Sequence, residues 1–474
     1  MANWKERWSG RGGWREVLNL SLPLILSTGS WSVQQFIDRV FLSWYSPEAI
    51  AAAAPANMLN FSIVCFFIGT AAFVSTFVAQ YFGAGQFHRI GPAVWQGVYV
   101  SFLGGLMVLS LWPGAETFFR LIGHSPEVQV LEVVYFRILC LGGFPVIGAA
   151  ALSGFFAGRG RTWPVMWVNL ASMVMNIILN YRLIFGRFGF PRLGIAGAGW
   201  ATIISVAFAF LAFLVMMMTP ENNRTFKTVS GWRPEKELFV RLLRFGVPSG
   251  IQFFLDLAGF TIFVLLVGRL GTVNLAATNI AFNINMFAFM PMIGTGMAIT
   301  VLVGQYIGAG RPELAEKSTY SGFHLTFLYM GTVAVLYVVL PDLFIAPFAV
   351  QAEDGQYREI FALTVLLLRF VAVYSLFDSM NIIFISALKG AGDTRFVMYA
   401  LGGASGLVMV LPTFLAVMVL DWSLIACWGF MTAYVVLLGV ILWLRFRGGK
   451  WKEMRVIEHA PAPRPPDLAG APAE

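Results

Sequence analysis

Charged residues, cysteine and histidine are scarce in this sequence of 474 residues. Only 12% of the residues are charged, whereas 58% are hydrophobic; an average soluble domain carries about 25% charged residues. The three cysteines lie in apolar runs and share no metal-ligand spacing, so they indicate neither a metal site nor a disulfide framework: Cys65, Cys140 and Cys427. This composition argues against a soluble or disulfide-rich secreted domain and is typical of a helical membrane protein.

The motifs of several large protein classes are also missing. There is no G-x-x-x-x-G-K-[ST] sequence for an ATP-driven motor, no nucleophile elbow and no H-E-x-x-H. The net charge of +8 is not arranged as a basic stripe interleaved with aromatics, so we expect no nucleic-acid partner. We therefore expect neither an enzyme nor a bound cofactor, but a protein whose principal partner is the lipid bilayer.

Continuous apolar runs are abundant and long enough to span a bilayer, which takes about 20 residues. Unlike the alternating segments of outer-membrane strands, they predict an all-α integral membrane fold. Twelve transmembrane helices are expected near 17–44, 50–81, 92–112, 128–157, 162–184, 194–218, 237–268, 275–307, 317–341, 356–388, 394–418 and 422–445.

The positive charges orient these spans. If both termini are cytoplasmic, most of the 32 Lys and Arg residues fall on the inner side, as the positive-inside rule requires. The loop with Arg182, Arg187 and Arg192 goes against this bias. The N-terminal residues lack the pattern of a cleaved signal peptide. A multi-pass protein of the cytoplasmic (inner) membrane is predicted.

The chain contains two copies of one unit. "FVAQYFGAGQ" (77–86) recurs as "LVGQYIGAGR" (302–311), and "GFFAGRGRT" (154–162) is answered by "SALKGAGDT" (386–394). A six-span unit repeated in the same orientation is typical of secondary transporters with a midplane site between two lobes. The predicted division is a cytoplasmic lead-in at 1–16, an N-lobe at 17–218, an inter-lobe loop at 219–236, a C-lobe at 237–446 and a disordered cytoplasmic tail at 447–474.

The first half places one carboxylate, Asp38, inside the apolar stretch "SVQQFIDRVFLSW". An ionised carboxylate in such a place must pair, neutralise or bind a cation. Asn176 and Asn180 share one face of the fifth span because they are four residues apart, and the sixth span offers Thr202 and the carbonyl of Ala198. These oxygens suit Na⁺ or a protonated carboxyl; hydrogen bonds that merely link helices are the alternative.

The second half has its own acidic group. Asp256 lies in the seventh span, and Tyr374 and Asp378 share one face of the tenth. Neighbouring carboxylates in a low dielectric cannot both ionise cheaply, so either one takes up a proton or a cation lies between them. Intramembrane carboxylates usually mark ion or substrate paths. Whether Asp256 and Asp378 face each other is not decided by the sequence.

From about Val17 to Arg445 the chain resembles the multidrug and toxic compound extrusion (MATE) family. The resemblance rests on the combination of "LSLPLILSTGSWSVQQFID", "AQYFGAGQ", "NIILNYRLIFGRFGFPRLGIAGAGWAT", "NMFAFMPMIGTGMAITVLVGQYIGAG" and "ALKGAGDTR". It implies a two-lobed, twelve-helix antiporter that alternates access and exports organic cations or amphipathic drugs in exchange for Na⁺ or H⁺. We expect it to be a monomer.

The resemblance also implies roles for the polar residues. Asp38, with Asn176, Asn180 and Thr202 as partners, matches an N-lobe ion site, although some members carry Asp at the place of Asn180. Asp256, often Glu in the family, matches a C-lobe acidic position accompanied by Tyr374 and Asp378. A lipid-linked oligosaccharide flippase is the main alternative; its cavity should be more cationic than the Asp residues here suggest. A channel would need a ring of equivalent ligands, which this pattern does not offer.

Overall fold

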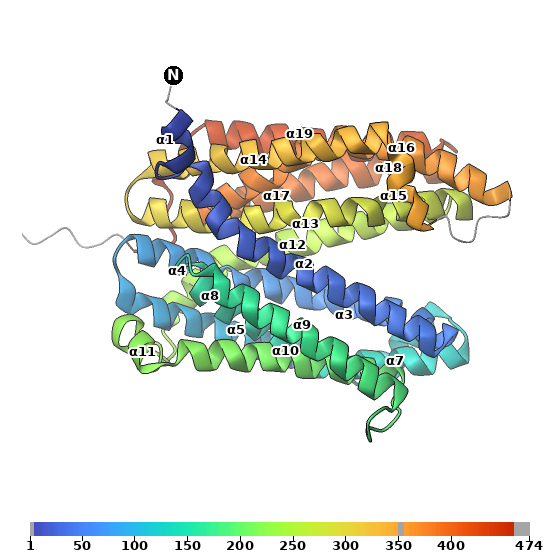
Figure 1. Ribbon diagram of the computed structural model, residues 1–474, viewed down its shortest axis with the longest axis horizontal. Coiled ribbons are helices and arrows are strands. Elements are labelled where there is room, and N and C mark those ends of the chain that lie inside the picture. Colours follow the sequence, from blue (N-terminus) through green and yellow to red (C-terminus); the bar gives the residue numbers. More distant parts are fainter. Residues whose placement is uncertain (1–3, 349–354, 459–474) are drawn as a thin grey trace, which may run out of the picture.

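The computed structural model describes residues 4–348 and 355–458, and every regular element in these ranges is helical. The helices run nearly parallel to one long direction and form two groups, the first half of the chain in blue and green and the second in yellow to red (Figure 1). The helices of the first half are α1 (Trp4–Ser9), α2 (Trp14–Tyr45), α3 (Pro47–Ala72), α4 (Val74–Gly83), η1 (Phe87–Arg89), α5 (Ile90–Leu109), α6 (Ala115–Ile122), α7 (Pro126–Leu141), α8 (Gly143–Ala157), α9 (Thr162–Phe185), α10 (Ile195–Met217) and α11 (Pro220–Phe226).

The second half repeats this order of long helices. They are α12 (Lys236–Gly268), α13 (Thr272–Gly308), α14 (Pro312–Val339), α15 (Pro341–Ile345), η2 (Ala346–Phe348), α16 (Gly355–Ala391), α17 (Thr394–Ala404), η3 (Ser405–Val410), α18 (Leu411–Met418), α19 (Leu424–Arg447) and η4 (Lys450–Glu453). Helices satisfy most of their backbone hydrogen bonds internally, which is what a lipid environment demands.

The predicted spans are present as helices. Ten helices of the described residues are long and apolar enough to cross a membrane, and α7 with α8 forms one more span bent by 43°. α2 is not among these because serine, threonine and glutamine interrupt its apolar residues between Ser27 and Gln35. At 32 residues it is nevertheless long enough to span. The all-α, twelve-span fold is thus confirmed, and the chain is a multi-pass membrane protein.

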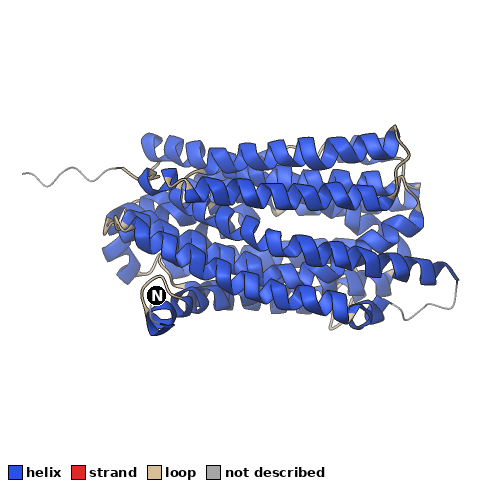
Figure 2. Cartoon of the chain, turned by 90° about the horizontal axis from the view of Figure 1, so that it is seen from above, coloured by secondary structure: helices blue, strands red, loops and turns tan. Residues whose placement is uncertain are grey.

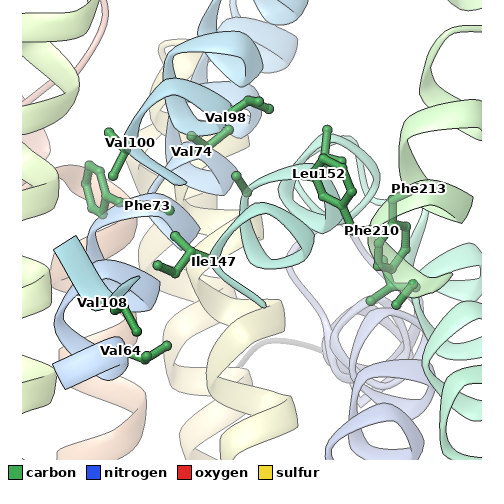
Figure 3. Close-up of a cluster of buried hydrophobic side chains, with 14 of the residues drawn as sticks. Val64, Phe73, Val74, Val98, Val100, Val108, Ile147, Leu152, Phe210 and Phe213 are labelled. Atoms are coloured by element: carbon green, nitrogen blue, oxygen red, sulfur yellow. The ribbon is translucent and has the colours of Figure 1, made fainter. Parts of the chain in front are cut away.

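The interior consists of two hydrophobic clusters. The first joins α3, α4, α5, α8 and α10, with Phe73, Val98, Ile147, Leu152 and Phe213 among its buried side chains (Figure 3). The second is formed mainly by α13, α14, α16 and α19. Two leucines at the start of α12 belong to the first cluster, although α12 opens the second half. The halves are therefore joined through α12 as well as through the connecting loop.

The two halves meet closely where glycine removes the side chain. A Cβ at Gly69 of α3 would lie 2.9 Å from the Cα of Gly250 in α12, and one at Gly294 of α13 would lie 2.6 Å from the backbone nitrogen of Ile25 in α2. Small residues allow such backbone approach between transmembrane helices. One end of the bundle is formed by segments 84–89, 158–161, 309–311 and 448–458. We call it the positively charged end. This end is at the left of Figure 1, near α1 and α11, and it is also at the left of Figure 2.

The segment after α19 differs from the expected tail. Instead of leaving the bundle at 447, the chain forms η4 and buries Trp451 completely against Phe446. Val456 and Ile457 are buried in the first hydrophobic cluster. The predicted lead-in also contains structure, since α1 and the first turn of α2 lie within residues 1–16. Residues 459–474 of the predicted tail lie outside the described residues.

Candidate functional site

The structure brings the first-half carboxylate and both carboxamides together. Asp38 is carried by α2, and Asn176 and Asn180 by α9. The Nδ2 of Asn180 donates to Asp38 Oδ1 over 2.5 Å and to Asn176 Oδ1 over 2.9 Å. Both asparagines are fully buried, whereas Asp38 is half-buried. Asn180 therefore holds one oxygen of the Asp38 carboxylate, and no hydrogen bond to the second oxygen is found within the described residues.

Serine residues continue this polar chain into α10. Asn176 Nδ2 donates to Ser205 Oγ over 3.4 Å, and Ser172 Oγ donates to the Ser205 carbonyl over 2.7 Å. The predicted Thr202 does not reach Asp38 directly: its hydroxyl donates to the carbonyl of Ala198 over 3.0 Å. Sequence reasoning missed Ser205, although its place three residues after Thr202 puts it on the same helix face.

An unpaired oxygen suits this group to a cation. Asn180 Oδ1 is buried and has no hydrogen-bond partner among the described residues. A buried acceptor of this kind is costly unless an ion, a proton donor or water satisfies it. With Asp38 and Asn176 it offers the oxygen ligands that hard cations prefer. The residues present therefore fit Na⁺, and they fit a protonated Asp38 equally well.

The second-half residues gather around Asp378. Asp256 on α12 is close enough to Asp378 on α16 for their charges to interact, and Asn381 lies within hydrogen-bond reach of Asp378. The hydroxyl of Tyr374 accepts a bond from Asn285 Nδ2 of α13 at 3.3 Å. The two carboxylates thus lie within electrostatic range of each other. The buried Oδ1 atoms of Asn285 and Asn381 have no partner within the described chain.

A lysine completes this second group. Lys389 belongs to the last turn of α16. Its Nζ donates to Gln252 Oε1 of α12 over 3.2 Å, and its charge acts on Asp256. Two carboxylates and one ammonium leave this group with one net negative charge when all are ionised.

Removing the Ser205 hydroxyl tests whether the polar chain supports Asp38. In Ser205→Ala, Asn176 Nδ2 loses its acceptor, so we expect a loss of about 1 kcal/mol in stability, typical of one net hydrogen bond, and a weaker response to the coupling ion. Thermal melting in detergent and ion-dependent transport would measure both. Ser153→Ala is the matched control, because within the described chain Ser153 Oγ bonds the Ala150 carbonyl of its own helix and no other group. Equal effects of the two substitutions would contradict the role given to Ser205.

Two repeated six-helix units with carboxylates inside the bundle are the architecture of a two-lobed membrane transporter. A family model described as MatE matches residues 23–182 and 248–415. The chain belongs to this family, the MATE transporters, which confirms the resemblance read from its motifs. Each matched segment lies within one half of the bundle.

Named relatives agree over most of the chain. It is 30% identical over 387 residues to the multidrug resistance protein PmpM of Pseudomonas aeruginosa, with 81% of this chain and 80% of that protein covered. It is 26% identical to the probable multidrug resistance protein NorM of Thermotoga maritima, with 94% of each covered. A solved structure described as the outward-facing conformation of a multidrug resistance MATE family transporter has a TM-score of 0.84 at 19% identity, covering 93% of this chain and 97% of that one.

Proposed function

We propose that this protein is a secondary multidrug exporter that exchanges organic cations or amphipathic drugs for Na⁺ or H⁺ by alternating access. The observation that carries the proposal is Asp38, a carboxylate inside the bundle with one oxygen fixed by Asn180. Membership of the MATE family and the names of the multidrug resistance relatives support the substrate class. The proposal makes the chain a transport protein rather than an enzyme.

Coupling requires only that ion and drug compete for negative charge. When the ion leaves Asp38, or the group around Asp256 and Asp378, the freed charge attracts a cationic drug. When the ion binds, that attraction is lost. Two ligands that exclude each other in this way are coupled by a free energy that is equal in both directions. A Na⁺ ion would be held by Asp38, Asn176 and Asn180, with the hydroxyl of Thr202 as a further candidate ligand, while a proton would bind Asp38 itself.

The direction of export follows from the proposed orientation. The positive-inside rule places the positively charged end, with both termini, in the cytoplasm. In a bacterium such as the hosts of the named relatives, this membrane is the inner membrane. We propose a monomeric working unit, since each chain holds both lobes. A lipid-linked oligosaccharide flippase is not favoured, because its anionic pyrophosphate cargo would meet the negative charge of Asp38, Asp256 and Asp378.

Proteoliposomes test the function and identify the ion. We expect a fluorescent organic cation to move into or out of the vesicles when a Na⁺ gradient or a pH gradient is imposed, each gradient being applied separately. A response to Na⁺ makes the Asp38 group a metal-ion site, whereas a response to pH alone makes its carboxylate a proton carrier. If correctly folded protein responds to neither gradient, the antiport proposal fails.

A further inference from the structure

The two copies of the repeated motif touch each other at the positively charged end. Gln80 Nε2 donates to the carbonyl of Gly390 over 2.9 Å, and Gln305 Nε2 donates to the carbonyl of Gly158 over 2.9 Å. Gln80 and Gln305 occupy the same place in "AQYFGAG" and "GQYIGAG", and Gly158 and Gly390 occupy the same place in "GRGRT" and "GAGDT". Each half therefore binds the backbone of the other half through the same residue of the repeat.

Glycines at a second repeated place allow this contact. A Cβ at Gly83 would lie 1.9 Å from the backbone oxygen of Gln305, and a Cβ at Gly308 would lie 2.1 Å from the backbone oxygen of Gln80. Real Cβ atoms essentially never come this close to another heavy atom, and a backbone oxygen cannot rotate away as a side chain can. Helix α4 of the first half and α13 of the second thus cross backbone to backbone, and any side chain at 83 or 308 would force them apart.

Tyrosines at a third repeated place extend the contact. Tyr81 donates its hydroxyl to Glu458 over 2.7 Å, and Tyr306 donates its hydroxyl to Glu16 over 2.8 Å. Again each bond joins opposite halves, since Glu16 begins α2 and Glu458 follows α19. Glu458 also pairs with Arg241 at 2.6 Å.

The Glu458 carboxyl is held ionised. Burial of this carboxyl raises its pKa. The hydrogen bonds from Tyr81 and Arg89 and the charge of Arg241 lower the pKa by more than burial raises it, so the pKa of Glu458 lies below its ordinary value. A carboxyl with a lowered pKa contributes its full stability at pH values above its ordinary pKa. That stability is lost as the pH falls through the lowered pKa, where the carboxyl takes up a proton.

We propose that this reciprocal arrangement of Gln80, Gly83, Gln305 and Gly308 is the gate that closes the positively charged end of the transporter. The inference rests on the alternating access proposed above, because a transporter that opens this end must separate its halves here. The hydrogen bonds of Gln80, Gln305, Tyr81 and Tyr306 described above each join one half to the other, so a rigid movement of the halves breaks them together. These residues then set the balance between the states closed and open at this end.

Distances between spin labels test the gate directly. His88→Cys and Glu313→Cys place labels at equivalent, exposed positions of the two repeats, in a chain whose native cysteines are replaced. In Gly83→Ala and in Gly308→Ala, we expect a larger fraction of molecules with a long label–label distance than in the labelled chain without these substitutions. The expected increase is roughly tenfold, because a modest free-energy change shifts a two-state equilibrium by this much. Gly429→Ala is the matched control, since a Cβ there meets nothing within 4 Å.

A milder variant guards against loss of the fold. Gln305→Leu keeps a side chain of similar size but removes the bond to Gly158, and we expect a smaller shift in the same direction. If Gly83→Ala, Gly308→Ala and Gln305→Leu all elute as folded protein with the distance distribution of the Gly429→Ala control, the gate is overturned.

The distance measurement is made without drug or ion gradient, so it is separate from the transport assay. If the unsubstituted protein exports no drug but the glycine variants show the expected shift in distance, the proposed function is refuted and the gate is supported. If the unsubstituted protein exports drug but the distances in the variants do not shift, the proposed function is supported and the gate is refuted.

Discussion

Asp38→Asn should remove most of the ion-coupled export while leaving the protein folded. The carboxamide has nearly the shape of the carboxyl group, and its oxygen can still accept the bond that Asn180 Nδ2 donates. Only the charge and the capacity to bind a proton are lost. Allosteric couplings of about 1–3 kcal/mol correspond to about 5–150-fold effects, and we expect gradient-driven uptake to fall by a factor in that range. The measurement is the initial rate of cation uptake under an imposed gradient.

The control for this substitution is Asp342→Asn. Asp342 is in the first turn of α15, away from both polar groups, so its loss should leave uptake unchanged. Size-exclusion profiles and melting temperatures of both variants should match those of the unsubstituted protein. Unchanged ion-coupled uptake by folded Asp38→Asn would remove the ion role of Asp38 and leave the carboxylates of the second half as the coupling site.

The sequence was sufficient for the helices and their repetition, because most spans are continuous apolar runs and the repeated motifs lie at helix ends. It was less informative where the helices are irregular. The bend of 43° between α7 and α8 occurs within an uninterrupted apolar run, and the polar middle of α2 gives this span a weaker hydropathy signal than the others. The ordered segment after α19 was missed because the Pro- and Ala-rich residues beyond it dominated the composition of the predicted tail.

For the candidate site, the spacing of four residues correctly placed Asn176 and Asn180 on one face. This spacing rule does not predict contacts between different helices. The bond from Asn180 to Asp38 and the neighbourhood of Asp256 and Asp378 depend on how α2, α9, α12 and α16 pack, which no local spacing encodes. The part of Lys389 in this group was missed for a related reason: counting positive charges by loop says nothing of the direction of a side chain, and this one turns toward Gln252.

Asp256→Asn and Asp378→Asn should each remove most of the transport, and combining them should remove little more. With Lys389 beside them, the two carboxylates carry one net negative charge when all three groups are ionised. Either substitution brings that net charge to zero, so the attraction for a cation is already lost in the single variants. We expect each single variant to lower the initial uptake rate by about 5–150-fold. The double variant should lower the rate by much less than the product of these two factors, as residues that act as a unit do.

Tyr374→Phe is the appropriate comparison, because it removes the acceptor of the Asn285 bond without changing any charge. It should cost much less transport than either Asp substitution. If the effects of Asp256→Asn and Asp378→Asn instead multiply in the double variant, the two carboxylates act independently. Interacting neighbours typically show coupling energies of about 0.5–3 kcal/mol in a double-mutant cycle. A coupling near zero would therefore mean that the carboxylates of α12 and α16 do not act as one charged group.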